Sequence, residues 1–293
     1  MSPTDSRPAH PLAGVAYLIA ASFTLSVMDA TARYLVLAGV PVLMLAWIRY
    51  TVHVTLLTAY ALPRGGAILY RSAVPGLQLL RGVLLIVCTL LFFSTLGYLP
   101  LAEATALGFT APLIVMALSP WLLGEPARLA RWIGILVAFA GMLIVIRPGG
   151  GLHPVGIGLG LLTAIAFAAF HMVTRLVARD SPLTSNFYSG MVGMLGLAPI
   201  VPFVWRQLDL GPWQWALLLS TGCTGALGHL LHTSAFRAAP ASLLSPFAYV
   251  QILAATMVGW LVFGNVPDTV TSVGMTTIFA AGVGVALSER RAR

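Results

Sequence analysis

Long stretches without aspartate, glutamate, lysine or arginine constrain this chain more than any other feature of its sequence. Eight of them contain 20 or more residues: 8–28, 82–102, 104–124, 148–174, 181–205, 210–236, 238–267 and 269–288. A helix needs about 20 mostly apolar residues to cross a bilayer. An open chain satisfies its backbone hydrogen bonds in lipid only as a helix, so these stretches predict membrane-spanning helices.

The composition excludes a water-soluble globular protein. Hydrophobic residues make up 59% of the chain and charged residues 8%, against about half and about a quarter in soluble domains. The net charge of +8 comes from arginines spread between the apolar stretches, so we expect no nucleic-acid partner. Cys88 and Cys223 both lie inside apolar stretches, so they predict neither a disulfide framework nor a cysteine metal site.

Shorter apolar runs and the positions of prolines complete the map of spans. Proline favours helix ends because it cannot donate the backbone hydrogen bond that a helix interior requires. The sequence therefore predicts an all-α integral membrane protein with ten transmembrane helices. Their expected ranges are 12–38, 41–62, 73–97, 100–122, 130–146, 155–178, 183–204, 212–236, 240–263 and 269–288. The first range contains Asp29 and Arg33 and is too long for a cleavable signal, so we expect it to be retained.

The distribution of arginine predicts the orientation, because cytoplasmic loops of membrane proteins carry an excess of basic residues. With the amino terminus inside, the outer loops hold Arg147 and Arg206. The cytoplasmic ends then hold Arg7, Arg64, Arg71, Arg128, Arg131, Arg179, Arg237, Arg290, Arg291 and Arg293. We therefore expect a multi-pass protein of a bacterial-type inner membrane with both termini in the cytoplasm.

The two halves of the chain resemble each other. Residues 99–105 open the fourth expected helix much as residues 238–244 open the ninth. If each half contains five spans, an odd number, the second half enters the membrane inverted, as in many secondary transporters. The predicted organisation is a cytoplasmic tail, two five-helix repeats and a second cytoplasmic tail, with the ranges 1–11, 12–148, 155–288 and 289–293.

A further set of residues carries a family resemblance. Its members are Arg49, 80–82, 98–105, Pro112, 122–125, Arg131, Trp132, Gly134, Gly141 and 146–149. In this pattern the chain resembles drug/metabolite transporters built from two EamA units, strongly over 14–148 and weakly over 156–288. The second unit departs from the pattern, because Asn265 stands where a glutamate matching Glu125 is expected. The resemblance implies ten helices, the fifth and tenth as a supporting pair, around a cavity framed by the other eight.

Ionisable side chains at membrane depth are costly and usually face the interior of a bundle or a wet cavity. Helical spacing places Asp29 on an inward face of the first helix, and Gln78 and Arg81 on that of the third. One interpretation is that Asp29 or Arg81 binds the amino or carboxylate end of a zwitterionic substrate. The other is that Asp29 forms a neutralising ion pair with Arg81, Arg49 or Arg33.

Aromatic and polar side chains also share faces of three later helices. They are Phe167, Phe170 and His171 on the sixth, His229, His232 and Phe236 on the eighth, and Tyr249 and Gln251 on the ninth. These faces are typical of a cavity that accepts large apolar or aromatic groups. They are also compatible with packing or lipid contact.

Proton coupling would require a side chain that titrates, and every basic residue in this chain is an arginine. Candidate proton carriers are therefore Asp29, Glu103 and His171, together with His229 and His232. Glu103 has a simpler interpretation as a favourable charge at the amino-terminal end of a helix. His229 and His232 lack a carboxylate on their helix to complete a metal site, so we expect neither a metal nor a cofactor.

These features favour a secondary transporter of small organic solutes, most simply an exporter of amino acids that include aromatic ones. An importer or exchanger of another metabolite, such as S-adenosylmethionine, is the alternative. An enzyme has less support because the spans lack paired carboxylates, an HExxH motif and a Ser-His-Asp set. A channel would require a ring of like groups around a pore, and the sequence shows no such ring, so a channel is also disfavoured. Ten spans can enclose a cavity without a partner, so we expect a monomer.

Overall fold

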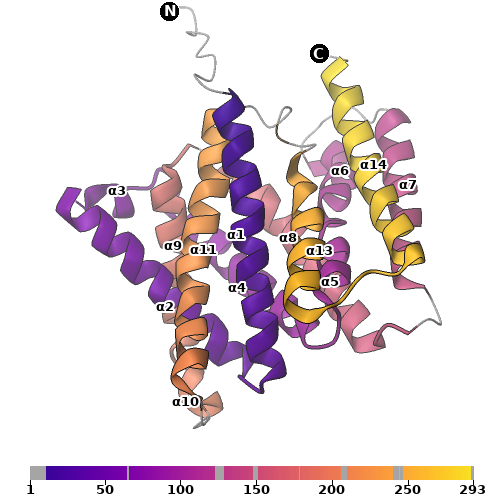
Figure 1. The fold of residues 1–293 in the computed structure, drawn as a ribbon. Helices are drawn as coiled ribbons and strands as arrows, with labels where there is room; N and C mark the ends of the chain where they lie inside the picture. The colour runs from indigo at the N-terminus through magenta and orange to yellow at the C-terminus, as the bar shows by residue number, and fades with distance from the viewer. Residues whose placement is uncertain are drawn as a thin grey trace, which may run out of the picture.

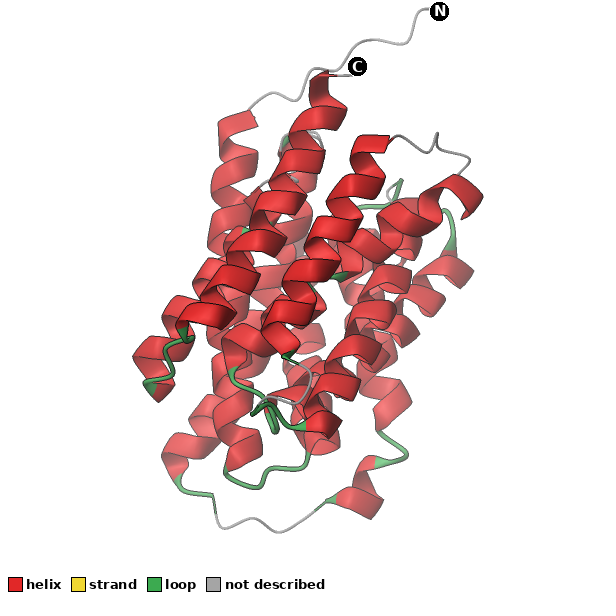
Figure 2. Cartoon of the chain, turned by 90° about the vertical axis from the view of Figure 1, so that its right-hand side faces the viewer, coloured by secondary structure: helices red, strands yellow, loops and turns green. Residues whose placement is uncertain are grey.

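The computed structural model describes residues 11–64, 66–122, 129–147, 151–177, 179–205, 210–239, 244 and 247–291. Every regular element within these ranges is a helix (Figure 1, Figure 2). Four of the described helices are long and apolar enough to cross a membrane, and they span Leu12–Leu37, Val42–Arg64, Pro75–Leu96 and Pro154–Leu176. Shorter apolar helices cover Leu101–Val115, Trp132–Ile146, Val250–Phe263 and Thr269–Val285.

The helices of the first half lie close to their expected ranges. They are α1 (Pro11–Leu37), α2 (Val42–Ala61), η1 (Leu62–Arg64), α3 (Ala67–Tyr70), α4 (Pro75–Leu96), α5 (Leu101–Gly108), α6 (Ala111–Leu122) and α7 (Leu129–Ile146). The short helices η1 and α3 were not predicted. Proline marks helix starts as expected at Pro41 and Pro100, which directly precede α2 and α5. Pro75, which opens α4, was not predicted as a boundary.

The second half contains α8 (Pro154–Leu176), α9 (Pro182–Leu197), α10 (Val201–Val204), α11 (Pro212–Ala238), α13 (Val250–Phe263) and α14 (Thr269–Arg291). Proline again occupies the first turn of α8, α9 and α11. The expected ninth helix, 240–263, is described only from Leu244 onward, and 240–243, 245 and 246 lie outside the described residues.

Two of the expected helices are broken. The range 100–122 divides into α5 and α6 at Phe109 and Thr110, because Pro112 has no backbone N–H to offer the carbonyl of Gly108. The range 183–204 divides into α9 and α10 at Pro199, which likewise has no backbone N–H for the hydrogen bonds of its own helix. Prediction of one continuous helix was wrong at both places.

Helices from the two halves pack together in a reciprocal pattern (Figure 1). In chain order the first half supplies α1, α2, α4, α5 with α6, and α7, and the second supplies α8, α9, α11, α13 and α14. α1 packs against α11 and α13, and α8 packs against α4 and against α5 and α6. α2 packs against α9, α5 against α13, and α7 against α14. If each helix is replaced by its counterpart in the other half, the same set of packed pairs results.

The α1–α11 and α4–α8 pairs are both antiparallel. A side chain on Gly14 would meet Ala239, whereas Leu25 lies against Gly228 farther back along α11. In the second pair, Arg81 contacts Thr174 at one end, and Gly156 meets Leu99 at the other. α1 begins and α14 ends at the same end of the bundle (Figure 1).

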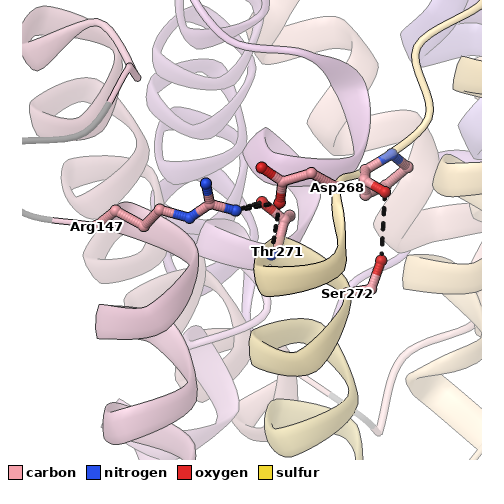
Figure 3. A network of polar contacts seen from close by, with 5 residues as sticks. Arg147, Asp268, Thr271 and Ser272 are labelled. Atoms are coloured by element: carbon pink, nitrogen blue, oxygen red, sulfur yellow. Dashed lines mark hydrogen bonds and ion pairs between the residues drawn. The ribbon is translucent and has the colours of Figure 1, made fainter.

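α7 and α14 approach each other closely through glycine. A Cβ atom on Gly141 would lie 2.9 Å from the backbone oxygen of Gly274, and one on Gly274 would lie 2.7 Å from that of Gly141. Such contacts let two backbones pack tightly in a membrane. Beyond them the Arg147 guanidinium donates to Asp268 and to Thr271 Oγ1 (Figure 3). The pKa of Asp268 is lowered by its bond from Arg147 and by the Thr271 N–H that it caps.

Candidate functional site

A cavity of about 210 Å³ lies among the helices. Its described wall comes from α1, α2, α4, α5, α6, α8, α11 and α13 together with Ala248, and not from α7, α9, α10 or α14. The wall is mainly apolar and aromatic, with a few charged and hydroxyl side chains. This composition is typical of binding sites for small organic molecules.

The cavity is displaced toward the end of the bundle where α1 begins. On α8 its wall runs from Phe167 to Thr174 and on α11 from His229 to Thr233, in the half of each helix that lies next to the start of α1, whereas on α1 itself it occupies the middle, from Leu18 to Asp29. The last two turns of α1 pack into an apolar core, where Leu35 is fully buried with Leu96 at the end of α4 and Leu99 just beyond it. Well-packed side chains therefore separate the cavity from the far end of the bundle.

Most of the side chains that the sequence nominated meet at this cavity. Those on its wall are Asp29, Arg81, Phe167, Phe170, His171, His229, His232 and Gln251. The four remaining candidates, Gln78, Phe236, Tyr249 and Glu103, are not part of the wall. A role for the wall residues in binding substrate stays a prediction.

Gln78 supports the structure beside the cavity. Its side chain is fully buried, and its amide nitrogen donates to Asp180 Oδ2 at 2.8 Å and to Ser185 Oγ at 2.9 Å. Asp180 also accepts from Ser72 Oγ and from the N–H of Ala73. Burial acts to raise the pKa of Asp180, but these hydrogen bonds outweigh it and hold the pKa below its usual range. Gln78 thus joins the start of α4 to the α8–α9 connection.

The rings of Tyr249 and Phe236 lie outside the cavity wall and contact other side chains. The Tyr249 ring packs with Phe109 and Phe279, at centroid separations of 5.9 and 6.1 Å. It lies on Gly282, where any side chain would overlap it. Phe236 is 44% exposed and stacks beside His232 at 5.1 Å. The expectation that these two rings line the cavity was wrong, because helical spacing does not show which helix packs over each face.

Arg49 is a wall residue that the sequence suggested as part of the family pattern and as an ion-pair partner of Asp29, but not as a cavity residue. It is 2% exposed, and its Nη2 donates to His229 Nε2 at 3.0 Å while Nη1 donates to Thr89 Oγ1 at 3.3 Å. Its Nε lies 3.2 Å from the sulfur of Met28, and its guanidinium stacks on the Tyr50 ring at 4.9 Å. All three nitrogens of Arg49 therefore have partners, none of them a carboxylate.

Arg81 is held on one side only. Its Nε donates to Thr174 Oγ1 at 3.0 Å, and its Nη1 donates to the Ser185 carbonyl at 2.9 Å and to Ser189. The guanidinium stacks on Phe170 at 4.8 Å. Within the described residues Nη2 has no partner, yet it is not among the fully occluded polar atoms. Arg81 thus keeps one donor group free at the cavity wall.

Asp29 also keeps its polar atoms free. The residue is 6% exposed and lies on the wall. Neither carboxylate oxygen has a hydrogen bond or salt bridge with a described residue, and neither is fully occluded. Arg49 attracts Asp29 electrostatically without a direct bond. The alternative of a direct ion pair with Arg33, Arg49 or Arg81 is therefore not found among the described contacts.

Glu103 lies outside the cavity wall, in the first turn of α5, where the helix dipole favours an acid. Its Oε2 is buried without a described partner. Arg33, which attracts it electrostatically, donates to the Leu96 carbonyl at 3.0 Å and stacks on Phe263 at 5.1 Å. Proton coupling through Glu103 stays a prediction.

Histidines gather around the two wall arginines. The His171 ring on α8 lies 5.7 Å from that of Phe170, and His171 acts electrostatically on His232 on α11. Sequence reasoning missed His53, which is 2% exposed and lies 6.3 Å from the His229 ring. Neither ring nitrogen of His53 has a partner among the described residues. No described cluster has the three ligands that a metal ion would need.

The sequence profile of the EamA-like transporter family matches residues 12–147 and 154–287, which together cover nearly the whole chain. The chain belongs to the EamA-like transporter family. This membership confirms the resemblance to drug/metabolite transporters with two EamA segments, and it makes the chain a multi-pass membrane protein of the inner-membrane type.

Similar curated proteins are transporters of different molecules. The pseudopaline exporter of Pseudomonas aeruginosa is 30% identical over 94% of this chain and 97% of its own. The riboflavin transporter of Vibrio cholerae is 30% identical over 88% and 87%, and the S-adenosylmethionine uptake transporter of Rickettsia bellii is 26% identical over 76% and 76%. A solved crystal structure, 21% identical, covers 98% of this chain and 100% of its own with a TM-score of 0.67, which shows a shared fold.

Proposed function

We propose that this EamA-family protein is a secondary carrier that exports small amino-acid-like solutes, including aromatic ones. The observation that carries the proposal is the presence of two oppositely charged side chains with free polar atoms, Asp29 and Arg81, on one cavity wall. A zwitterion supplies the complementary charge to each.

The chemistry of binding follows from the wall. The Asp29 carboxylate accepts hydrogen bonds from a substrate ammonium group, and the free Nη2 of Arg81 donates to a substrate carboxylate. Phe92, Phe167 and Phe170 offer ring faces for an aromatic or other planar group. Gln251 and Thr174 add neutral polar contacts.

Transport requires the cavity to open alternately to each side of the membrane. We propose that the two halves are inverted repeats, which the reciprocal packing of α1 with α11 and of α8 with α4 supports. With both termini in the cytoplasm, the present cavity lies nearer the inner side, and the core around Leu35 and Leu96 closes the outer side. A monomer of ten spans suffices for this cycle.

Import or exchange of another metabolite is the second candidate. It is favoured by the similarity to S-adenosylmethionine uptake transporters over 76% of the chain. The same cavity would then load from outside. A membrane enzyme is less well supported, since the described cavity wall has no paired acids and no nucleophile with an adjacent base.

The experiment is uptake of labelled phenylalanine, tryptophan and leucine into proteoliposomes that contain the full chain, with and without an imposed pH gradient. We expect saturable flux that unlabelled substrate competes away. The Asp29→Asn variant should lose it, whereas Asp268→Asn, at a residue outside the cavity wall, should not. Absence of flux for every amino acid tested, together with flux of S-adenosylmethionine, would replace the first candidate by the second.

A further inference from the structure

The cavity wall carries unequal numbers of cations and anions. Among the described residues, its cations are Arg49 and Arg81 and its only acid is Asp29. The three wall histidines add no negative charge in either protonation state. An unbalanced charge is costly in a site surrounded by apolar helices, because little water is present to solvate it.

The other acids with described side chains do not contact Arg81. Glu103 is outside the cavity wall, in the first turn of α5, where Arg33 attracts it electrostatically. Asp180 accepts hydrogen bonds from Ser72, Ala73 and Gln78 rather than from Arg81. Asp268 is bonded to Arg147. Within the described residues, no acid is therefore left to neutralise the second wall arginine.

The two arginines also differ in what they leave available. Arg49 donates to Thr89 and His229, and it acts on Asp29 through space, so these two opposite charges offset each other. Arg81 has no opposite charge and retains a free Nη2. The excess positive charge of the site is thus located at Arg81.

We propose that the preferred substrate carries a second acidic group in addition to an amino-acid head, so that its net charge is −1. This inference rests on the proposed function and narrows it. The ammonium group lies against Asp29 and one carboxylate against Arg81. The second carboxylate lies toward His171 and His232, whose ring nitrogens have no hydrogen-bond partners among the described residues.

A substrate of this kind leaves no uncompensated charge in the cavity. Its two carboxylates and one ammonium group offset the single excess cation of the empty wall. A simple zwitterion, by contrast, leaves the bound site with the same excess positive charge as before. The charge of the substrate, more than its size, should therefore set affinity.

The test compares ligands of matched shape as inhibitors of the flux of labelled phenylalanine into proteoliposomes. N-(carboxymethyl)phenylalanine has two carboxylates and one ammonium group, and N-(carbamoylmethyl)phenylalanine replaces the added carboxylate by an amide of similar size. Phenylalanine and phenethylamine complete the series. We expect the dicarboxylate to inhibit at a concentration at least tenfold lower than its amide, and phenethylamine to inhibit weakest.

Equal inhibition by the dicarboxylate and its amide would overturn the inference while leaving a carrier of phenylalanine intact. If no compound of the series were transported, the proposed function itself would be contradicted. The comparison uses the unmodified protein, so it does not depend on the folding of a variant.

A substitution then tests whether the preference for the dicarboxylate depends on Arg81. Arg81→Gln should remove the preference for the dicarboxylate over its amide, because the excess positive charge is gone. Arg64→Gln is the matched control, since Arg64 is exposed and donates to the Tyr60 carbonyl away from the cavity. Retention of the full preference in Arg81→Gln would contradict the assignment to Arg81.

Discussion

At the scale of single residues, the wall arginines depend on the shape of the guanidinium group. Arg49 reaches Met28, Thr89 and His229 with three different nitrogens while stacking on Tyr50. A lysine ammonium group is a compact point charge and cannot hold this planar set of contacts. The positive charge alone therefore does not account for the presence of arginine here.

Replacement of Arg49 by lysine should keep the charge and lose the fixed geometry. We expect a loss of about 1–3 kcal/mol in stability, from hydrogen bonds to a charged group that are not replaced. The measurement is the unfolding temperature in detergent together with the KM for transport. Arg64→Lys serves as the control, and an equal effect of the two substitutions would show that the contacts of Arg49 contribute nothing particular.

Asp268 gives a prediction about pH. Its pKa lies below the usual 3.8 because it accepts hydrogen bonds from Arg147 and Thr271. A carboxyl whose pKa is lowered by folding contributes stability above the unfolded value and loses it as the pH falls through the folded value. The unfolding temperature should therefore fall as the pH drops below about 4, and less so in Asp268→Asn. Parallel pH curves for the two proteins would contradict this role.

Residue patterns predicted the cavity only in part. Asp29 and His171 could be found because a lone polar group in an apolar helix must face the interior. Gln78 satisfied the same rule, yet it bonds to Asp180, a residue 102 positions away in the sequence. The contact between Arg49 and His229 spans 180 positions. Sequence spacing within one helix cannot show which of these distant partners a polar side chain will meet.

At the scale of the helices, prediction succeeded where proline marks an end and failed where it lies inside a span. Pro41 directly precedes α2 and Pro154 begins α8, close to the expected limits. Pro112 and Pro199 instead divide helices that hydropathy alone joins. Apolar composition reports that a segment lies in the membrane, whereas the loss of a single backbone donor determines whether its helix continues.

The α7–α14 pair yields a test of close packing. Alanine at Gly141 would place a Cβ atom 2.9 Å from a backbone oxygen of α14, so the helices must separate. We expect Gly141→Ala to destabilise the protein by about 1–3 kcal/mol. Alanine at Gly284 meets nothing within 4 Å and should be neutral or slightly stabilising. The measurement is the unfolding temperature of each variant, and equal values would exclude a packing role for Gly141.

At the scale of the whole molecule, the order of helices and their membrane character were predictable because they follow from apolar length and arginine placement. The reciprocal pairing of α1 with α11 and of α8 with α4 was not, since it depends on contacts between distant segments. Nor did the sequence indicate that the cavity would lie toward the end where α1 begins and that a packed core would close the other. That asymmetry describes one conformation of a carrier.

Counterflow tests this account most directly. Proteoliposomes are loaded with unlabelled phenylalanine and diluted into a trace of labelled phenylalanine. A carrier with one alternately exposed site should accumulate label transiently above equilibrium, and Asp29→Asn should abolish the overshoot. Label that enters only to equilibrium, at a rate proportional to concentration and unchanged by the internal phenylalanine, would contradict a single alternating site.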